Sequence, residues 1–211
     1  MISAATARVR SGTEPILLPP PEPEGGLSIE AALHQRRSVR AFAPAALAFK
    51  DVAQLLWAAQ GMTDARGFRT APSAGALYPL EVYLAAGAVE QLHAGVYHYD
   101  PIAHAVSIML AGDQRAALSR ATLGQTWVRD AAAALVICAV YRRTMAKYGE
   151  RGIRYAQIEV GHAAQNVYLQ AVSLGLGTVM VGAFDDDQVR TLLGMTDDCQ
   201  PLGIMPIGKP G

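Results

Sequence analysis

The chain has 211 residues, 51% of them hydrophobic, and its 18 basic side chains balance 18 acidic ones. Zero net charge gives no long-range attraction to nucleic acid or to an anionic membrane. The longest strongly apolar run, residues 131–140, is too short to cross a bilayer as a helix, and two cysteines make neither a disulfide framework nor a metal cluster. The N-terminus lacks the features of a secretory signal. We therefore expect a cytoplasmic protein with no nucleic-acid, membrane or metal partner.

The first 27 residues are rich in proline and glycine, with four prolines between positions 19 and 23 and glycines at 25 and 26. This composition resists both helix and central strand. We expect an extended arm over residues 1–27, either disordered or packed on a partner subunit. Residues 28–211 are expected to form a single domain, because the chain is long for one small domain and short for two ordinary ones.

From Ser28 onward the pattern predicts regular elements. Ser28 can cap a helix that runs to the Arg36 region, and a second helix over 50–60 ends at Gly61. Strands are expected at 80–86, 95–99 and 104–110, followed by a helix at 113–122 and a buried strand at 131–141. A long helix over 149–174, buried nearly all round, is followed by a strand at 178–181, a helix at 187–193 and a last strand near 202–207.

Two conclusions about architecture follow from this order of elements. Strands and helices are mixed without a regular βαβ rhythm, which favours the α+β class. The long helix would measure roughly 39 Å at about 1.5 Å per residue, which is more than the core of a small domain needs. We expect part of this helix to pack on a second copy of the chain.

Cations gather at the end of the first predicted helix, where Arg36, Arg37 and Arg40 surround Ser38. Three guanidinium groups and a hydroxyl can bind a phosphate monoester, because arginine forks match phosphate oxygens. A short basic run at a helix C-terminus also complements the helix dipole and is usually solvated, so both interpretations stay open. Lys209, just past the last strand, can complete an anion site or be an ordinary surface charge.

Two further segments are candidate walls of a ligand site. Residues 71–79, APSAGALYP, contain mostly small residues between prolines, so their backbone amides can approach a flat ligand closely. A tight connection into the following strand would have the same composition. Residues 174–185, LGLGTVMVGAFD, contain a helix stop, a strand and a glycine-bearing loop, which is either a wall of a cofactor site or a plain turn.

The order of these segments is more informative than any one of them. RRSVR at 36–40, PSAGALYP at 72–79, EVGHAAQNVYLQAVSLGLGT at 159–178, VGAFD at 181–185 and PIGKP at 206–210 follow one another along the chain. Together they resemble the nitroreductase-like flavoprotein family over residues 28–210. Within that family, APSAGALYPLEVYL, GVYHYDP and KYGERGIRYAQIEVGHAAQN are most similar to the SagB-type dehydrogenases, which oxidise azoline rings in peptides.

The resemblance implies a nitroreductase-like fold, with a central mixed, mostly antiparallel sheet flanked by helices and a long central helix at a homodimer interface. It implies FMN bound non-covalently at that interface. Arg36, Arg37, Ser38 and Arg40 match the family's phosphate- and ribityl-binding segment, and Lys209 matches a second phosphate contact. Two further loops match those around the ring: Pro72, Ser73, Ala74 and Gly75, usually from the other subunit, and Val181, Gly182 and Ala183, whose backbone amide faces flavin N5.

Lys147 and Tyr148 match the Lys-Tyr pair that the azoline-oxidising branch has near the flavin. Dehydrogenation of a carbon needs a base that takes a proton while hydride leaves for N5, and this is the chemistry the pair would perform. The alternative is that both residues only end a helix before Gly149.

The resemblance leaves three functions open. The leading hypothesis is an FMN-dependent dehydrogenase of an azoline-like small or peptidic substrate, which passes electrons on to dioxygen. The second is an NAD(P)H-dependent reductase of nitroaromatics or quinones that uses the same pocket. The third is a flavin-binding partner subunit, without turnover of its own, in a peptide-modifying complex.

Overall fold

A seven-stranded sheet forms the centre of the fold, with strand order β1-β4-β3-β2-β5-β7-β6. The computed structural model describes residues 14–196 and 198–211. The strands are β1 (Ile16–Leu17), β2 (Leu80–Ala86), β3 (Gly95–Asp100), β4 (Ala105–Ala111), β5 (Ala133–Val140), β6 (Gly177–Thr178) and β7 (Cys199–Gly208). All pairings between these strands are antiparallel, and parallel pairing occurs only at isolated bridges. The α+β class is confirmed.

The central strand β5 explains why the sheet has a core on each face. All eight of its residues are buried. Successive side chains of a strand point to opposite faces, so Leu135 and Ile137 join one apolar cluster while Val136 and Cys138 join the other. This burial on both faces accounts for the continuous apolar run seen in the sequence.

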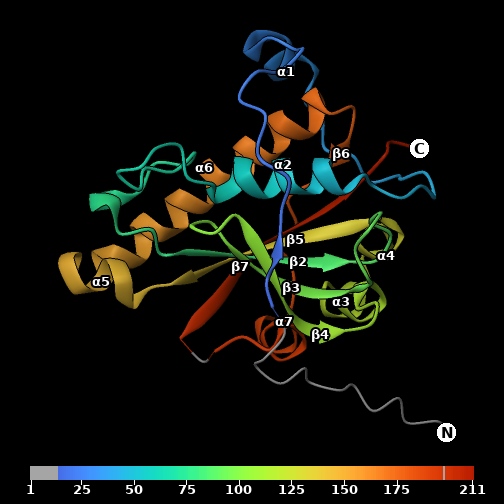
Figure 1. Ribbon diagram of the computed structural model, residues 1–211. Coiled ribbons are helices and arrows are strands. Elements are labelled where there is room, and N and C mark those ends of the chain that lie inside the picture. Colours follow the sequence, from blue (N-terminus) through green and yellow to red (C-terminus); the bar gives the residue numbers. More distant parts are fainter. Residues whose placement is uncertain (1–13, 197) are drawn as a thin grey trace, which may run out of the picture.

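Helices cover both faces of the sheet, with α2 and α6 on one side and α7 on the other (Figure 1). The first side packs residues of α2 and α6 on the sheet, and the second packs residues of α3, α4 and α7. The helices are α1 (Ile29–Gln35), α2 (Phe49–Gln60), α3 (Arg115–Ala121), α4 (Thr126–Asp130), α5 (Arg142–Tyr148), α6 (Arg151–Ser173) and α7 (Asp186–Leu193), with a 3-10 turn at Ala74–Ala76. The structure describes no helix long and apolar enough to span a bilayer.

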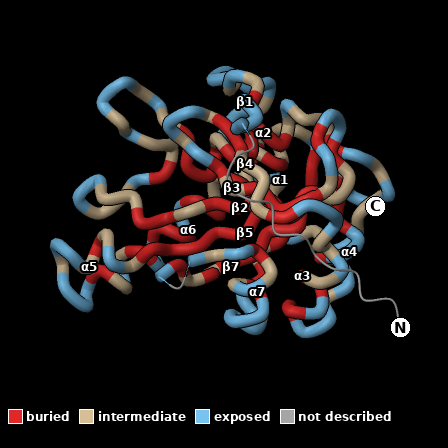
Figure 2. The backbone as a smooth tube through the Cα atoms, turned by 60° about the horizontal axis from the view of Figure 1, so that its bottom comes forward, coloured by how far each residue is buried: buried red, intermediate tan, exposed pale blue. Residues whose placement is uncertain are grey.

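The long helix differs from its prediction in two ways. It begins at Arg151, and a separate helix, α5, precedes it. Gly149, with φ +56°, ends α5. The expectation of burial nearly all round is wrong for the single chain, because only one face is covered and Ile158 is 51% exposed. Figure 2 shows buried and exposed stretches alternating along the outer elements, while the central strands β2, β5 and β7 are mostly buried.

The proline-rich arm packs on its own chain over the residues that the structure describes. Ile16 and Leu17 pair with β4 as an edge strand, and His104 Nε2 lies 2.8 Å from the carbonyl oxygen of Pro19. Further on, the Gln54 side chain accepts from the amide of Glu22 and donates to its carbonyl. Residues 14–27 of the arm therefore contact the chain's own sheet edge and α2. Residues 1–13 of the predicted arm lie outside the described residues.

Candidate functional site

The predicted phosphate segment lies beside the last strands of the sheet. Ser38 forms a parallel bridge with Thr178 of β6, and the amide of Val39 donates to the Thr178 carbonyl at 2.9 Å. A few residues later Phe42 bridges Pro210, and the amide of Ala43 donates to the carbonyl of Lys209 at 2.9 Å. The backbone therefore brings residues 36–40 and Lys209 to the same edge of the fold.

The side chains of this segment have different partners. The Arg36 guanidinium lies 5.2 Å from the centre of the Tyr168 ring, and Ser38 Oγ is 3.3 Å from Tyr168 Oη. The Arg40 guanidinium lies 5.9 Å from the Trp127 ring. Arg37 instead donates to the carbonyls of His34 and Arg36 at the end of α1. Arg37 therefore binds the end of a helix, as one of the two interpretations predicted. Arg36 and Arg40 instead lie over aromatic rings.

The glycine-bearing loop follows β6 at the same edge. Val181 pairs with Ile204 of β7, and the amide of Met180 donates to Tyr168 Oη at 2.7 Å. Gly182 and Ala183 are exposed, and a Cβ built on Gly182 would meet nothing within 4 Å. Tyr168 of α6 thus ties the arginine segment to this loop, whose backbone is open to a ligand.

Two buried polar atoms at this edge have no hydrogen-bond partner among the described residues. They are Thr178 Oγ1, in the residue paired with Ser38, and Trp127 Nε1, in the ring beneath Arg40. Native structures leave few buried polar groups unsatisfied, and those that occur often mark a functional site. Exposed cations, an open glycine loop and these two atoms fit a phosphate-bearing flat cofactor.

The Pro72–Gly75 loop forms a tight, internally bonded turn before β2. Ser73 Oγ accepts from the amide of Tyr78 at 2.9 Å, and the Ser73 carbonyl accepts from the amide of Ala76 at 3.0 Å. Gly75 has φ +64°, a left-handed conformation that favours glycine. Ala76 and Tyr78 also have positive φ values. Small residues in this loop therefore allow backbone conformations that larger residues rarely adopt, and they also leave the loop surface without bulky side chains.

Lys147 and Tyr148 lie directly against this loop. An added Cβ on Gly75 would be 2.7 Å from Tyr148 Oη and 3.1 Å from Lys147 Nζ. Both residues end α5 before Gly149, as the structural interpretation had it. The two interpretations are therefore compatible, because the end of α5 is what carries the pair to the loop.

An ionic network fixes α5 relative to the loop and β2. Arg143 donates to the carbonyl of Tyr78 at 2.9 Å and forms an ion pair with Glu81. The other carboxylate oxygen of Glu81 lies 2.6 Å from His98 Nε2. Burial by itself would raise the pKa of Glu81, but the His98 hydrogen bond and the Arg143 charge outweigh it, so the pKa lies below its usual range. The carboxylate of Glu81 is therefore the stable form in the folded chain.

This lowered pKa predicts an acid-dependent loss of stability. A carboxyl whose pKa is lower in the folded state stabilises the fold above its unfolded pKa, and that contribution disappears as the pH falls through the folded pKa. We expect Glu81→Gln to lower the Tm near neutral pH and to flatten its decline below the ordinary pKa of 4.5. Thermal melts across this range test the expectation, with the exposed Glu30→Gln as control. Parallel curves for wild type and Glu81→Gln would contradict it.

Gly152 of α6 packs tightly against the backbone of α5. A Cβ there would lie 2.7 Å from the backbone of Thr144 and Met145, which cannot yield as a flexible side chain could. We expect Gly152→Ala to destabilise the chain by about 1–3 kcal/mol, as overpacking does. Gly161 of the same helix has open space around it, so Gly161→Ala should instead stabilise by about 0.5–1 kcal/mol. Urea denaturation of both variants measures the difference, and equal effects would contradict the close packing.

The predicted residues thus form two groups, one beside the N-terminal half of α6 and one beside its C-terminal half. Figure 1 shows α5 at one end of this helix and α1 with β6 at the other. Glu159, beside the Pro72–Gly75 loop, and Tyr168, beside the arginine segment, are nine positions apart on α6, or roughly 14 Å at the helical rise. Within one chain, the residues of each group lie close together, and the two groups lie apart along α6.

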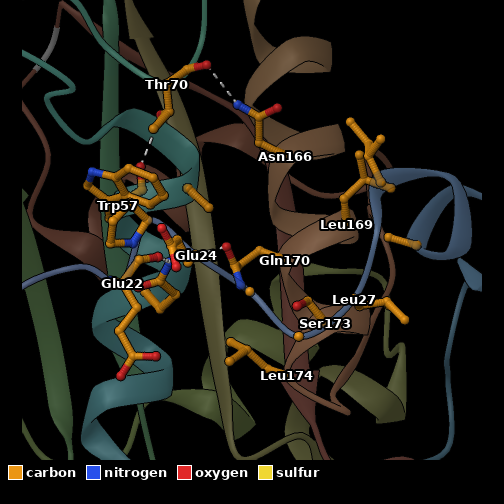
Figure 3. Close-up of a pocket in the computed structure, with 17 residues that line it drawn as sticks. Glu22, Glu24, Leu27, Trp57, Thr70, Asn166, Leu169, Gln170, Ser173 and Leu174 are labelled. Atoms are coloured by element: carbon orange, nitrogen blue, oxygen red, sulfur yellow. Dashed lines mark hydrogen bonds between the residues drawn. The ribbon is translucent and has the colours of Figure 1, made fainter.

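Two cavities border these elements. One of about 270 Å³ is lined by residues of the loop and α6, namely Pro72, Ser73, Ala74, Tyr155, Ile158, Glu159 and His162. Another of about 520 Å³ lies between the arm, α2 and the C-terminal half of α6, where Asn166 donates to the Thr70 carbonyl (Figure 3). The second cavity contains none of the residues predicted from the sequence. The first one contains three of them.

Three residues of this arrangement escaped the sequence analysis. Tyr168 ties the arginine segment to the glycine loop, Arg143 holds α5 to β2, and Glu159 contacts the Pro72–Gly75 loop. Glu159 had a readable signal, since a lone carboxylate on the apolar face of an amphipathic helix must find a partner. The other two had none, because their partners are distant in the sequence.

Comparisons with known proteins find relatives of this chain in sequence and in fold. The model of the nitroreductase family matches residues 33–209. A protein of Methanocaldococcus jannaschii whose name assigns it to the nitroreductases is 45% identical over 183 residues, covering 87% of this chain and 91% of its own. The microcin B17-processing protein McbC of Escherichia coli is 33% identical over 133 residues, 60% of this chain and 48% of McbC.

Among solved structures, the E. coli microcin synthetase McbBCD complex with truncated pro-MccB17 bound contains a chain with a TM-score of 0.72. It is 27% identical, and the match covers 95% of this chain and 79% of that one. Members of the matched family are generally oxidoreductases that use a flavin. On the extent of the family match and the 45% identity, this chain belongs to the nitroreductase family.

Proposed function

We propose that this chain is an FMN-dependent dehydrogenase that oxidises azoline-like rings in a small or peptidic substrate. One observation carries the proposal: Lys147 Nζ and Tyr148 Oη lie so close to Gly75, in the loop predicted to lie on the flavin ring, that a Cβ added there would be 3.1 Å and 2.7 Å from them. A reductase that only shuttles hydride has no need of a base there. The similarity to McbC, named for its part in processing a peptide, supports the same choice.

The cofactor would be held by the two groups of residues described above. Arg36, Ser38, Arg40 and Lys209 would bind the phosphate and ribityl chain, with Arg37 supporting the segment through α1. Val181, Gly182 and Ala183 would line one side of the ring, and Pro72, Ser73, Ala74 and Gly75 the other. When bound, FMN supplies the acceptor for a hydride. Lys147 Nζ or Tyr148 Oη then takes the proton that the same ring loses, so two electrons and two protons leave the azoline.

We propose further that each site combines groups from two copies of the chain. The two groups lie beside different halves of α6 in one chain, and the outer face of that helix is uncovered, with Ile158 half exposed. Pairing two copies along α6 would cover this face and bring one copy's loop to the other copy's arginines. A sedimentation measurement that finds only monomer with FMN bound would refute this arrangement.

A second function is favoured by the M. jannaschii relative, whose name assigns it to the nitroreductases. An NAD(P)H-dependent reductase of nitroaromatics or quinones would use the same cofactor residues. It would differ in the first half-reaction, because the nicotinamide would deliver the electrons.

Anaerobic reduction of the FMN-loaded chain separates the candidates. Bleaching of the flavin by an azoline-containing peptide, with slow or no bleaching by NAD(P)H, supports the dehydrogenase. Rapid bleaching by NAD(P)H alone refutes it in favour of the reductase. If FMN binds but neither reagent reduces it, the result indicates a partner subunit. If the chain binds no FMN, all three proposals are refuted.

A further inference from the structure

Glu159 is the only aspartate or glutamate buried in the part of the chain that the structure describes, with 4% of the residue exposed. It lies on the covered face of α6, near Ala156 and Ala163. None of the ion pairs formed by the described residues includes it. Withdrawing a carboxylate from water is costly unless other groups compensate for the lost hydration.

The compensating partner is the loop that precedes β2. The amide of Ala74 donates to Glu159 Oε1 at 2.9 Å. Burial raises the pKa of Glu159, and hydrogen bonds from Ala74 and Ser73, with the nearby His162, offset this only in part. Ala74 opens the 3-10 turn that contains Gly75. One buried carboxylate therefore binds the first amide of the turn that faces Lys147 and Tyr148.

The preceding turn of α6 supports the Lys147–Tyr148 pair, which faces the Pro72–Gly75 loop. Tyr155, four residues before Glu159, packs edge-to-face on Tyr148 with ring centres 5.1 Å apart. Gly75 and the Lys147–Tyr148 pair are thus each supported by a residue from successive turns of one helix. A rigid helix fixes the spacing between the two sides far better than a free loop could.

We propose that Glu159 is a positioning residue that holds the Pro72–Gly75 loop against Lys147 and Tyr148 before any cofactor binds. The loop geometry is a property of the chain itself, and only its effect on FMN binding rests on the proposed function. An ordered loop would present its bare surface to the flavin ring without an entropic penalty at binding. A loop freed from Glu159 would have to be ordered by the cofactor.

Amide hydrogen exchange of the cofactor-free chain tests the proposal directly. Glu159→Leu should speed exchange at Ala74 and its neighbours by about 10-fold or more, since a buried hydrogen bond is lost. Glu159→Gln keeps an oxygen acceptor and should restore most of the protection. Ser119→Ala is the control, because Ser119 is also buried and donates to the Gln125 carbonyl away from the loop.

A second variant removes the donor in place of the acceptor. Ser73 is extended, with φ −132° and ψ 139°, a conformation that suits a residue before proline. Ala74→Pro can therefore remove the amide hydrogen that binds Glu159 and leave the Glu159 side chain unchanged. It should also loosen residues 75–78. If Glu159→Leu does not fold, Ala74→Pro and Glu159→Gln decide the question.

FMN titration gives the remaining readout. We expect Glu159→Leu to weaken FMN binding by about 10-fold and to change the visible circular dichroism of the flavin, with Glu159→Gln close to wild type. Loop exchange that is unchanged in Glu159→Leu and Ala74→Pro, or raised only as uniformly as in Ser119→Ala, overturns the proposal. Failure of the wild-type chain to bind FMN would refute the proposed function while leaving the exchange result to decide the role of Glu159.

Discussion

Lys147→Ala is expected to bind FMN as wild type does and to oxidise an azoline-containing peptide about 10²- to 10⁴-fold more slowly, the usual contribution of a positioned base. The reason is geometric, because Lys147 Nζ contacts the loop at Gly75 while no phosphate-segment residue depends on it. The measurement is single-turnover bleaching of the flavin by the peptide in the absence of oxygen. Tyr148→Phe should slow the same step if the hydroxyl shares the proton transfer.

Arg142→Ala is the matched control for Lys147→Ala. It removes a cation from the same helix, but the Arg142 guanidinium pairs with Asp198 and not with the loop. We expect this variant to keep the wild-type rate. Full azoline oxidation by Lys147→Ala, or an equal loss in Arg142→Ala, would remove Lys147 from the reaction.

The second large effect is expected at the phosphate segment. Arg36→Ala or Arg40→Ala should weaken FMN binding by about 10- to 150-fold, the equivalent of about 1.5–3 kcal/mol for a charge-assisted hydrogen bond. Riboflavin has the same ring without the phosphate, so its affinity should change little. Because Arg40 is exposed, the difference between the two ligands should also shrink at high salt. Fluorescence titration of both ligands measures the effect.

Arg120→Ala provides the control, because Arg120 is an exposed arginine at the end of α3. A smaller loss is expected for Arg37→Ala than for the other two arginines, because its guanidinium already bonds to carbonyls of α1. Equal losses of FMN and riboflavin affinity would mean that the arginines support the fold and do not bind the phosphate.

Much of the fold could be predicted from local signals. Ser28 caps α1 by accepting from the amide of Ala31, Gly61 follows the last residue of α2, and β2 has the predicted bounds. These features depend on neighbours within a few residues. The short elements were harder to foresee. The helix α4 was not predicted, and β6 (Gly177–Thr178) overlaps the strand expected at 178–181 only at Thr178, because short elements form through tertiary contacts more than through propensity.

The candidate site, like the fold, could be predicted from the sequence only in part. Arginines near a serine and a bare loop between prolines can be read from the sequence as candidate binding segments. Their grouping cannot, because the Ala74–Glu159 hydrogen bond joins positions 85 apart and the Arg143–Tyr78 bond joins positions 65 apart. Nor does a helical pattern reveal that one face of α6 is uncovered in the single chain.

The sequence by itself determined most of the longer elements and the candidate binding segments between them, because capping, side-chain periodicity and glycine placement act over one or two turns of chain. The tertiary structure decided which of these groups meet. Antiparallel pairing of β6 and β7 carries the Lys209 backbone to the arginine segment, and Glu159 in the N-terminal half of α6 binds the Pro72–Gly75 loop. Such contacts depend on the packing of distant segments around a common core, and no local pattern contains that information.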